Sequence, residues 1–466
     1  MPKHERNDVM SKYSGYMDKV AKFDLSTGKL ETYPWSDKDK EMYIGGKMMA
    51  AKILYDNLSG KEEAFSAENV IVITTGPLTG TGAPSSARFD IAAISPETGA
   101  VEFCNCGGNF GYYLKKAGYD ALVLTGKCEE HSWLDIYNDS FILHNADREE
   151  IWGKGVIDSQ AAVREILDRD YGCRVKCGVV TIGAAGEEMR PYADVFSQER
   201  VAGNHGGIGA VFGWKNLKAI AVAGNHRPTV ANQEKLDAWN KKWIDAIRSN
   251  ALTASSAGAD HSNCLSCPIK CGVADVQPKG ETDPEREAFG LLEGDVLACK
   301  LKHSLVKMDA SDKLKSEFLF MMQNVLESIS ATGQCSYTGL TALPAEKSIE
   351  SAMAKCMNKL SPFIGFINKH PGIMFFPLSA FYHDREMKFA VGMKMNLGKY
   401  MRCGERGYTL EKYMQAIFGA EVACCCEDKE ALEKLLKMYY ALRSWSKEGV
   451  PTDATLKKLG IKKGSN

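Results

Sequence analysis

The sequence predicts an α+β fold in which a β-rich N-terminal domain, residues 1–228, precedes two α-helical domains, residues 229–310 and 311–466. Three observations lead to this prediction. Short β-branched runs closed by glycine fill the first half, a helical pattern replaces them after about residue 230, and three closely spaced cysteines follow that change. A chain of 466 residues also exceeds the roughly 250–300 residues that one hydrophobic core usually serves.

The first domain contains four apolar runs that predict strands, at Val70–Thr74, Ala121–Thr125, Val179–Ile182 and Ala219–Ala223. Helices should be few in this region. The one that we expect begins at an N-cap near Ser159 and ends before Tyr171 and Gly172.

Glycine-rich turns interrupt these strands at residues 45–47, 76–82, 106–109 and 203–209. Glycine permits φ > 0 and lets bare backbone N–H groups approach a ligand, so four such turns favour a phosphate-bearing cofactor. None of them matches a P-loop or the G-x-G-x-x-G spacing. The alternative is that each is only a turn.

The three cysteines of the second domain, Cys264, Cys267 and Cys271, lie within eight residues, a spacing typical of metal ligands. It favours an iron–sulfur cluster over a structural zinc site, which more often takes its ligands as two separated pairs. The alternative is three buried thiols without a metal. A cluster needs a fourth ligand from elsewhere in the chain.

The third domain contains a predicted amphipathic helix over residues 311–330, with apolar residues at three- and four-residue spacing and a stop at Gly333. Cys335 follows this rigid helix end and is the candidate fourth ligand. The alternative is a packed thiol, because free cysteine is often buried.

Three other features of this region are interpreted mainly as structural. A second amphipathic helix is expected over residues 428–445. The Cys424–Cys426 tract before it is interpreted as structural, because consecutive side chains diverge. The apolar segment 362–382 is either ordinary core or the lining of a pocket or subunit contact.

Charge and composition exclude several classes of function. The formal charge is −1 and no dense basic tract occurs, so no nucleic-acid partner is expected. The charged N-terminus and the lack of an apolar run of about 18 residues predict a cytoplasmic protein without a membrane span. In that compartment the fifteen cysteines favour metal ligation or packing over disulfides, and a cluster suggests an anaerobic setting.

Taken in this order, the motifs resemble those of the aldehyde:ferredoxin oxidoreductase family of tungsten, sometimes molybdenum, pyranopterin enzymes. The resemblance covers residues 13–275 and the C-terminal end. It is carried by Phe23–Lys29, Tyr43–Lys47, Gly76–Thr81 with Arg88, Asn105–Gly108, Ala117–Asp120, Trp152–Lys154, Gly206–Gly213, Asn216–Ile220, the cysteine triad, and Tyr439–Trp445 with Gly449–Thr452.

The resemblance implies a metal held by two pyranopterins between a β-rich base and the helical domains. It also implies a neighbouring [4Fe–4S] cluster bound by Cys264, Cys267, Cys271 and Cys335, with Arg88 between pterin and cluster. The implied cofactor contacts are Lys47, Arg88, Asn105, Gly107, Gly108, His205, Gly206, Gly207 and Ser330.

The chain departs from the family pattern in its helical part. Only 63 residues separate Cys271 from Cys335, fewer than in the family, so the chain resembles a shortened member. Ser330 stands where the family has an aspartate, and His205 stands where it has an arginine. The pterin contacts of the helical domains should therefore differ from those of the family.

Two glutamates are candidate catalytic residues by the same resemblance. Glu285 and Glu287 lie where the family has a Pro-Glu-Tyr-Glu-like segment near the active site. A carboxylate whose pKa is raised by burial can act as a general acid or base. The alternative is solvated surface charge.

The leading hypothesis is an oxidoreductase that interconverts a small aldehyde and a carboxylic acid, with ferredoxin or an iron–sulfur partner subunit as electron acceptor. The rival hypothesis is a non-catalytic electron-transfer or structural subunit of a larger redox complex, derived from the family by loss of part of the helical region. A third is reduction of an activated carboxylate or aromatic acid derivative. We expect an oligomer or complex in each case.

Overall fold

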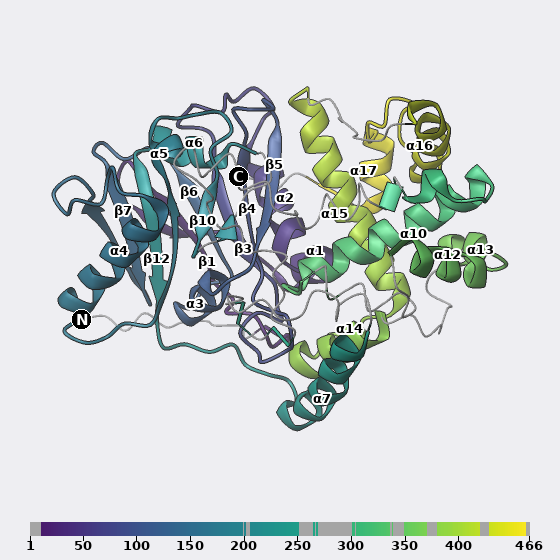
Figure 1. The fold of residues 1–466 in the computed structure, drawn as a ribbon, viewed down its shortest axis with the longest axis horizontal. Helices are drawn as coiled ribbons and strands as arrows, with labels where there is room; N and C mark the ends of the chain where they lie inside the picture. Colours follow the sequence, from purple (N-terminus) through teal and green to yellow (C-terminus); the bar gives the residue numbers. More distant parts are fainter. Residues whose placement is uncertain are drawn as a thin grey trace.

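The computed structural model of the chain describes residues 11–198, 200–201, 206–250, 264–265, 267–268, 301–302, 304–335, 338, 349–370, 380–419 and 428–462. Four predicted site residues, His205, Cys271, Glu285 and Glu287, lie outside the described residues, as does the Cys424–Cys426 tract. Helices and sheets are both present and the first half is rich in strands, which confirms the α+β prediction. Figure 1 shows this half in purple and blue, with the green and yellow helices beside it.

The first sheet has the strand order β2-β1-β6-β3-β4-β5. Only the β1–β6 pair is parallel among the described pairs of this sheet. Every residue of β3 and β4 is buried, because both faces of the sheet are covered. Its strands are β1 (Val20–Asp24), β2 (Leu30–Thr32), β3 (Ile71–Thr75), β4 (Phe89–Ile94), β5 (Val101–Cys106) and β6 (Ala121–Thr125).

The second sheet has the order β11-β10-β9-β12-β7-β8 and lies on the outer side of the first. The β12–β7 pair is parallel, and the other described pairs are antiparallel. Its strands are β7 (Ser132–Tyr137), β8 (Ser140–Asn145), β9 (Cys177–Ile182), β10 (Val195–Ser197), β11 (Arg200–Val201) and β12 (Leu217–Ala223). The four strands predicted from apolar runs are therefore confirmed as β3, β6, β9 and β12.

The strand-rich half also carries more helices than its sequence indicates. Most are short or are buried on nearly every side, as α2 is, so they show no amphipathic stripe. The predicted helix starts earlier than expected, because Gly155 is its N-cap and the Ser159 hydroxyl donates to the Lys154 carbonyl instead. These helices are α1 (Asp37–Tyr43), α2 (Gly46–Asn57), α3 (Phe110–Lys116), α4 (Val156–Asp170), α5 (Ala184–Glu187) and α6 (Ile208–Trp214).

The described residues of the second half form helices joined by loops, and none of them lies in a strand. Its elements are α7 (Gln233–Ser249), α10 (Asp312–Ala331), α12 (Ile349–Leu360), α13 (Ile364–Lys369), α14 (Ala380–Glu386), the π-helical turn η4 (Met387–Val391), α15 (Leu397–Ile417), α16 (Lys429–Arg443) and α17 (Asp453–Leu459). The two predicted amphipathic helices are confirmed as α10 and α16, with N-caps at Ser311 and Asp428. In the apolar segment 362–382, Phe363 and Phe366 are about half exposed, whereas Ile364 and Ile367 are buried in the helical core.

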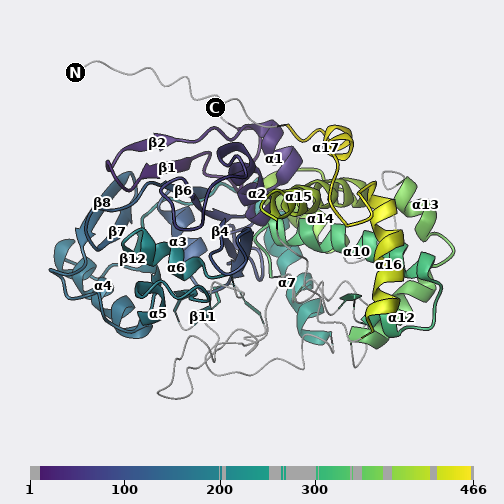
Figure 2. The same cartoon turned by 90° about the horizontal axis from the view of Figure 1, so that it is seen from above.

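Hydrophobic layers connect the two halves. One core lies between the sheets and includes Ile73 and Ile220. Another lies on the opposite face of the first sheet and joins Met48 of α2 to Leu410 of α15. Both views place α2 between the sheet and the helices α10 and α15 (Figures 1 and 2). The division at residues 228 and 310 stays a prediction.

Among the described residues, no helix combines the length and the apolar content that a membrane crossing demands.

Candidate cofactor and cluster site

The turn after α10 carries the predicted fourth cluster ligand and packs against the first sheet. Gly333 in this turn has φ +87°, which favours glycine, and its carbonyl accepts from the Arg88 N–H at 3.1 Å. The Cys335 N–H donates to the Ser85 carbonyl at 2.9 Å. The Arg88 guanidinium Nη2 lies 3.4 Å from Cys335 Sγ, and both side chains are buried. Arg88 therefore contacts this turn twice, through its backbone N–H at Gly333 and through its guanidinium at the Cys335 sulfur.

The glycine turn after β3 fits tightly against the same segment. A Cβ placed on Gly76 would lie 2.0 Å from the Thr332 carbonyl carbon, so no larger residue fits without a backbone shift. The Leu78 N–H donates to the Thr332 carbonyl at 3.0 Å. The role of this glycine is thus close backbone packing against the end of α10.

The turn after β5 carries the first cysteine of the triad. The Gly108 N–H donates to Cys264 Sγ at 3.3 Å, and the Leu265 N–H donates to the Gly108 carbonyl at 3.3 Å. A Cβ on Gly107 would lie 2.5 Å from Cys264 Sγ and 3.4 Å from the Arg88 guanidinium carbon. Gly107 thus allows the cysteine sulfur and the arginine to lie against the same turn.

These contacts fit a cluster site. Hydrogen bonds from N–H groups to the ligand sulfurs are one of the means by which proteins set the potential of iron–sulfur clusters. Cys264 receives such a bond from the backbone, and Cys335 lies beside the Arg88 guanidinium. The described cysteines do not form a group compact enough for a single metal ion. The four-cysteine ligand set stays a prediction, because Cys271 is outside the described residues.

A buried polar cluster lies beside this site, between the first sheet and the helices. Lys47 Nζ lies 3.0 Å from Glu327 Oε2 of α10 and 2.8 Å from Glu411 Oε2 of α15. Asn105 Nδ2 donates to Asp90 Oδ1 at 2.9 Å. Burial raises the pKa of Asp90 to about 7, although Asn105, Lys47 and Arg88 act in the opposite direction. We call Lys47, Asp90, Asn105, Glu327 and Glu411 the junction cluster.

Sequence reasoning found only Lys47 and Asn105 of this cluster. A weak signal for Asp90 existed, because it lies in β4 only two residues after the Arg88 motif position, which directly precedes that strand. Glu327 is a single buried carboxylate in an otherwise largely apolar stretch of α10, which was a second signal.

The remaining predicted cofactor contacts, Ser330, Gly206 and Gly207, have different neighbours from one another. The Ser330 carbonyl lies 3.2 Å from the Cβ position of Gly46, so this part of α10 lies against the turn at residues 45–47. Gly206 lies against Glu102 and Cys104, and a Cβ on Gly207 would lie 1.8 Å from the Pro191 carbonyl oxygen. Among the described neighbours of Gly206 and Gly207 there is none of the candidate cluster ligands, so their contact with a cofactor stays a prediction.

A second polar network, missed by sequence reasoning, lies behind Cys335. His383 Nδ1 and Gln334 Oε1 are 2.5 Å apart, and Gln334 Nε2 donates to Glu386 Oε2 at 2.5 Å. Burial lowers the pKa of His383 to about 3 and raises the pKa of Glu386 well above its ordinary range. Both side chains come from α14, far along the chain from the cysteine.

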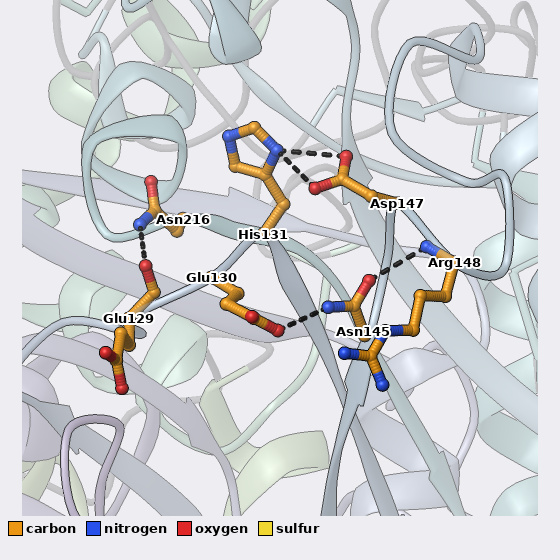
Figure 3. Close-up of a pocket in the computed structure, with 7 residues that line it drawn as sticks. All are labelled: Glu129, Glu130, His131, Asn145, Asp147, Arg148 and Asn216. Atoms are coloured by element: carbon orange, nitrogen blue, oxygen red, sulfur yellow. Dashed lines mark hydrogen bonds and ion pairs between the residues drawn. The ribbon is translucent and has the colours of Figure 1, made fainter.

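A surface pocket of about 370 Å³ lies away from these residues, on the edge of the second sheet. Figure 3 shows His131 hydrogen bonded to Asp147, and the Arg148 backbone N–H donating to Asn145 Oδ1. None of the predicted site residues lines it. The glutamates that do, Glu129 and Glu130, belong to a solvent-facing segment.

Comparison with family models matches both halves of the chain. Residues 20–224 match the model described as "Aldehyde ferredoxin oxidoreductase, N-terminal domain". Residues 293–461 match "Aldehyde ferredoxin oxidoreductase, domains 2 & 3". Together these ranges take in most of the chain.

Individual relatives agree. The chain is 32% identical over 238 residues to the tungsten-containing aldehyde ferredoxin oxidoreductase of Pyrococcus furiosus, covering 51% of this chain and 38% of the relative. The enzyme of the same description from Pyrococcus abyssi is 34% identical over 319 residues, 59% of this chain and 51% of the relative. A Pyrococcus furiosus protein described as "Aliphatic sulfonate oxidoreductase, WOR-like subunit" is 30% identical over 232 residues, 47% of this chain and 36% of the relative.

The coverage of these relatives and of one solved structure shows how far the similarity extends along the chain. The chain spans about half or less of the length of these curated relatives. A chain of the active site complex BamBC of benzoyl coenzyme A reductase, solved with 1,5-dienoyl-CoA, superposes with a TM-score of 0.65 at 18% identity, over 96% of this chain and 97% of that one. That likeness shows a shared fold. The matches to both family models, carried by the strand-rich and helical halves alike, place this chain in the aldehyde ferredoxin oxidoreductase family.

Proposed function

We propose that the chain is an oxidoreductase that interconverts an aldehyde and a carboxylate at a tungsten or molybdenum bis-pyranopterin. Electrons pass singly through a [4Fe–4S] cluster held by Cys264, Cys267, Cys271 and Cys335. The cofactor, when bound, supplies the two-electron chemistry, and the protein supplies binding, orientation and exclusion of water. Family membership supports an oxidoreductase, and the tungsten-containing relatives support the pterin.

The observation that carries this proposal is the position of Arg88. Its guanidinium lies 3.4 Å from Cys335 Sγ on one side and against the Gly107 turn, which receives Cys264, on the other. Segments that are distant in the chain therefore meet where the family resemblance expects a cluster. A cation among thiolates also stabilises their charge.

The other residues would divide the binding task. Lys47, Asn105, Gly107 and Gly108, with the turn at residues 205–207, would hold the pterins on the sheet side, and Ser330 would face them from α10. Glu285 or Glu287 would transfer the proton at the substrate. A ferredoxin or an iron–sulfur partner subunit would take the electrons, in an anaerobic cytoplasm.

Metal analysis of anaerobically purified protein tests this function. We expect about four irons per chain together with tungsten or molybdenum, and reduction of a viologen dye when aldehydes are added. Cys335→Ser should lose iron, whereas Cys356→Ser, which removes another buried thiol in α12, should retain it. Iron without tungsten or molybdenum in the wild type would contradict the proposal.

A second candidate is a non-catalytic electron-transfer or structural subunit of a larger redox complex. It is favoured by the short span of the chain relative to its curated relatives, and by the relative described as a WOR-like subunit. In that case the iron content should persist while no aldehyde supports dye reduction. Aldehyde-dependent dye reduction by the purified chain alone would rule this candidate out.

A further inference from the structure

Asn105 has one end of its side-chain amide engaged and the other end free. Its Nδ2 donates to Asp90 Oδ1 at 2.9 Å. Its Oδ1 is buried and, within the part of the chain that the structure describes, accepts no hydrogen bond. A buried acceptor without a donor costs free energy, so native structures rarely leave one. A donor from outside the chain would satisfy it.

Asp90 determines which end of the amide is free. The two residues are direct partners in the β4–β5 ladder, so their side chains lie on the same face of the sheet. The NH₂ group of Asn105 faces Asp90 and donates to its Oδ1. Above a pH of about 7, where the Asp90 carboxyl is ionised, it can only accept hydrogen bonds, and this orientation of the amide is then the one that its chemistry requires. Oδ1 is thereby turned away from Asp90, and the orientation of the amide follows from chemistry rather than from a choice between two similar fits.

Burying the Asp90 carboxyl costs folding free energy. It is 1% exposed, and the hydrogen bond from Asn105 is the one described for its side chain. Lys47 and Arg88 favour its charged form, while burial and Glu327 oppose it. A buried carboxylate with so little hydrogen bonding is typical of functional sites.

The turn that carries Asn105 also contacts the cluster site. Gly107 and Gly108 follow Asn105 after Cys106 and lie against Cys264, and Gly107 also lies near Arg88. Whatever binds Asn105 Oδ1 is therefore positioned by the same turn that receives a cluster cysteine.

We propose that Asp90 is a positioning residue that holds the Asn105 amide so that its Oδ1 accepts a hydrogen bond from an N–H group of the pyranopterin. This inference rests on the proposed function, and it assigns to Asp90 a role beyond the contacts that the family resemblance implies. Asp90 acts through Asn105 and does not touch the cofactor itself.

Three variants test the orientation directly. In Asp90→Asn two amides face each other and neither fixes the orientation of the other. The amount of pterin bound per chain should therefore fall about tenfold when the cofactor is limiting. Asn105→Asp places two carboxylates side by side and should be at least as harmful. The double variant D90N/N105D restores one NH₂-to-carboxylate bond and again leaves one oxygen free as an acceptor, so it should recover most of the pterin.

The readout is pterin, measured as its fluorescent oxidation product, together with tungsten or molybdenum per chain. Iron per chain serves as the internal control, because the cysteines are intact in every variant. Asp120→Asn is the matched control, since Asp120 is 2% exposed and accepts from the Met17 and Asp18 N–H groups, apart from the turn. It should lower stability yet leave the ratio of pterin to iron unchanged.

Stability separates a positioning role from a structural one. The pKa of Asp90 is raised in the folded chain, so its contribution to stability is full below its ordinary pKa and is lost as pH rises through about 7. Cofactor-free Asp90→Asn lacks this loss and should be at least as stable as the wild type at pH 8. A merely structural carboxylate would give a less stable variant.

The outcomes distinguish this inference from the function on which it rests. Wild-type protein that contains no pterin would remove the proposed function. If the wild type and the Asp90→Asn variant bind equal amounts of pterin, the role of Asp90 is overturned while the proposed function stands. A double variant that recovers no pterin would overturn the orientation mechanism.

Discussion

At the scale of single residues, the site depends on side chains whose partners are far away in the sequence. Arg88 and Cys335 are 247 positions apart, yet each was recognisable from its own motif. Gln334, His383 and Glu386 belong to no motif and acquire their roles only by meeting in one buried network. A motif can be recognised from adjacent residues, whereas a buried hydrogen bond in this network joins residues that are far apart in the sequence.

His383 leads to a prediction about pH. Its pKa is lowered to about 3 in the folded chain by burial, so the neutral imidazole contributes stability that is complete above the ordinary histidine pKa and is lost as pH falls from about 6.5 towards 3. His383→Asn keeps a donor for Gln334 but cannot titrate. The difference in unfolding free energy between wild type and variant should therefore shrink from pH 7.5 to pH 5.

Urea unfolding at the two pH values measures this difference. Glu386 has a raised pKa and the opposite pH dependence, but it is present in both proteins and so largely cancels. A difference that stays constant between the two pH values would show that His383 does not titrate in this way.

At the scale of elements, the sequence pattern worked best where an element has one buried face. The boundaries of α10 and α16 follow from an apolar stripe and a capping side chain, and both were predicted within a residue or two. The pattern failed for α2, whose nearly complete burial removes the periodic signal. It also missed that two buried ion pairs of Lys47 join α2 to α10 and α15.

Lys47 should therefore be a major contributor to the junction of these three helices. Glu327 is 6% exposed and Glu411 is 1% exposed. Removing the lysine leaves Glu327 without its cation and leaves Glu411 with Lys412 alone, whose Nζ lies 3.1 Å from Glu411 Oε1. We expect Lys47→Met to lower the free energy of unfolding by about 3–5 kcal/mol. Chemical denaturation of the cofactor-free protein gives the value.

A second substitution checks the cause. In the double variant K47M/E327Q one of the two carboxylates is neutral, so part of the lost stability should return, as a double-mutant cycle would measure. If the double variant is no more stable than Lys47→Met alone, packing rather than charge explains the loss.

At the scale of the whole molecule, the cluster site joins segments from both halves. The turn after β5, the arginine before β4, the cysteine triad and the turn after α10 converge on Arg88. A cluster bound there would cross-link the sheet to the helices, and its binding energy would add to the stability of the fold.

Removing iron should accordingly destabilise the entire chain. Anaerobic protein that is oxidised and then treated with a chelator should unfold several degrees lower than the untreated sample, as measured by circular dichroism. Cys335→Ser should already have the lower unfolding temperature and respond little to the chelator. Equal unfolding temperatures for treated and untreated wild type would argue against a cluster that links the two halves.

The sequence by itself determined the fold class, four buried strands, two amphipathic helices and the motifs that carry the family resemblance. These depend on local periodicity, capping and spacing, all of which can be read from a few adjacent residues. Only the tertiary structure decided that Lys47 pairs with Glu327, 280 positions away, and that Asp90 orients Asn105. The reason is physical: burial sets the cost of an unpaired charge or amide, and burial exists only once distant segments have packed together.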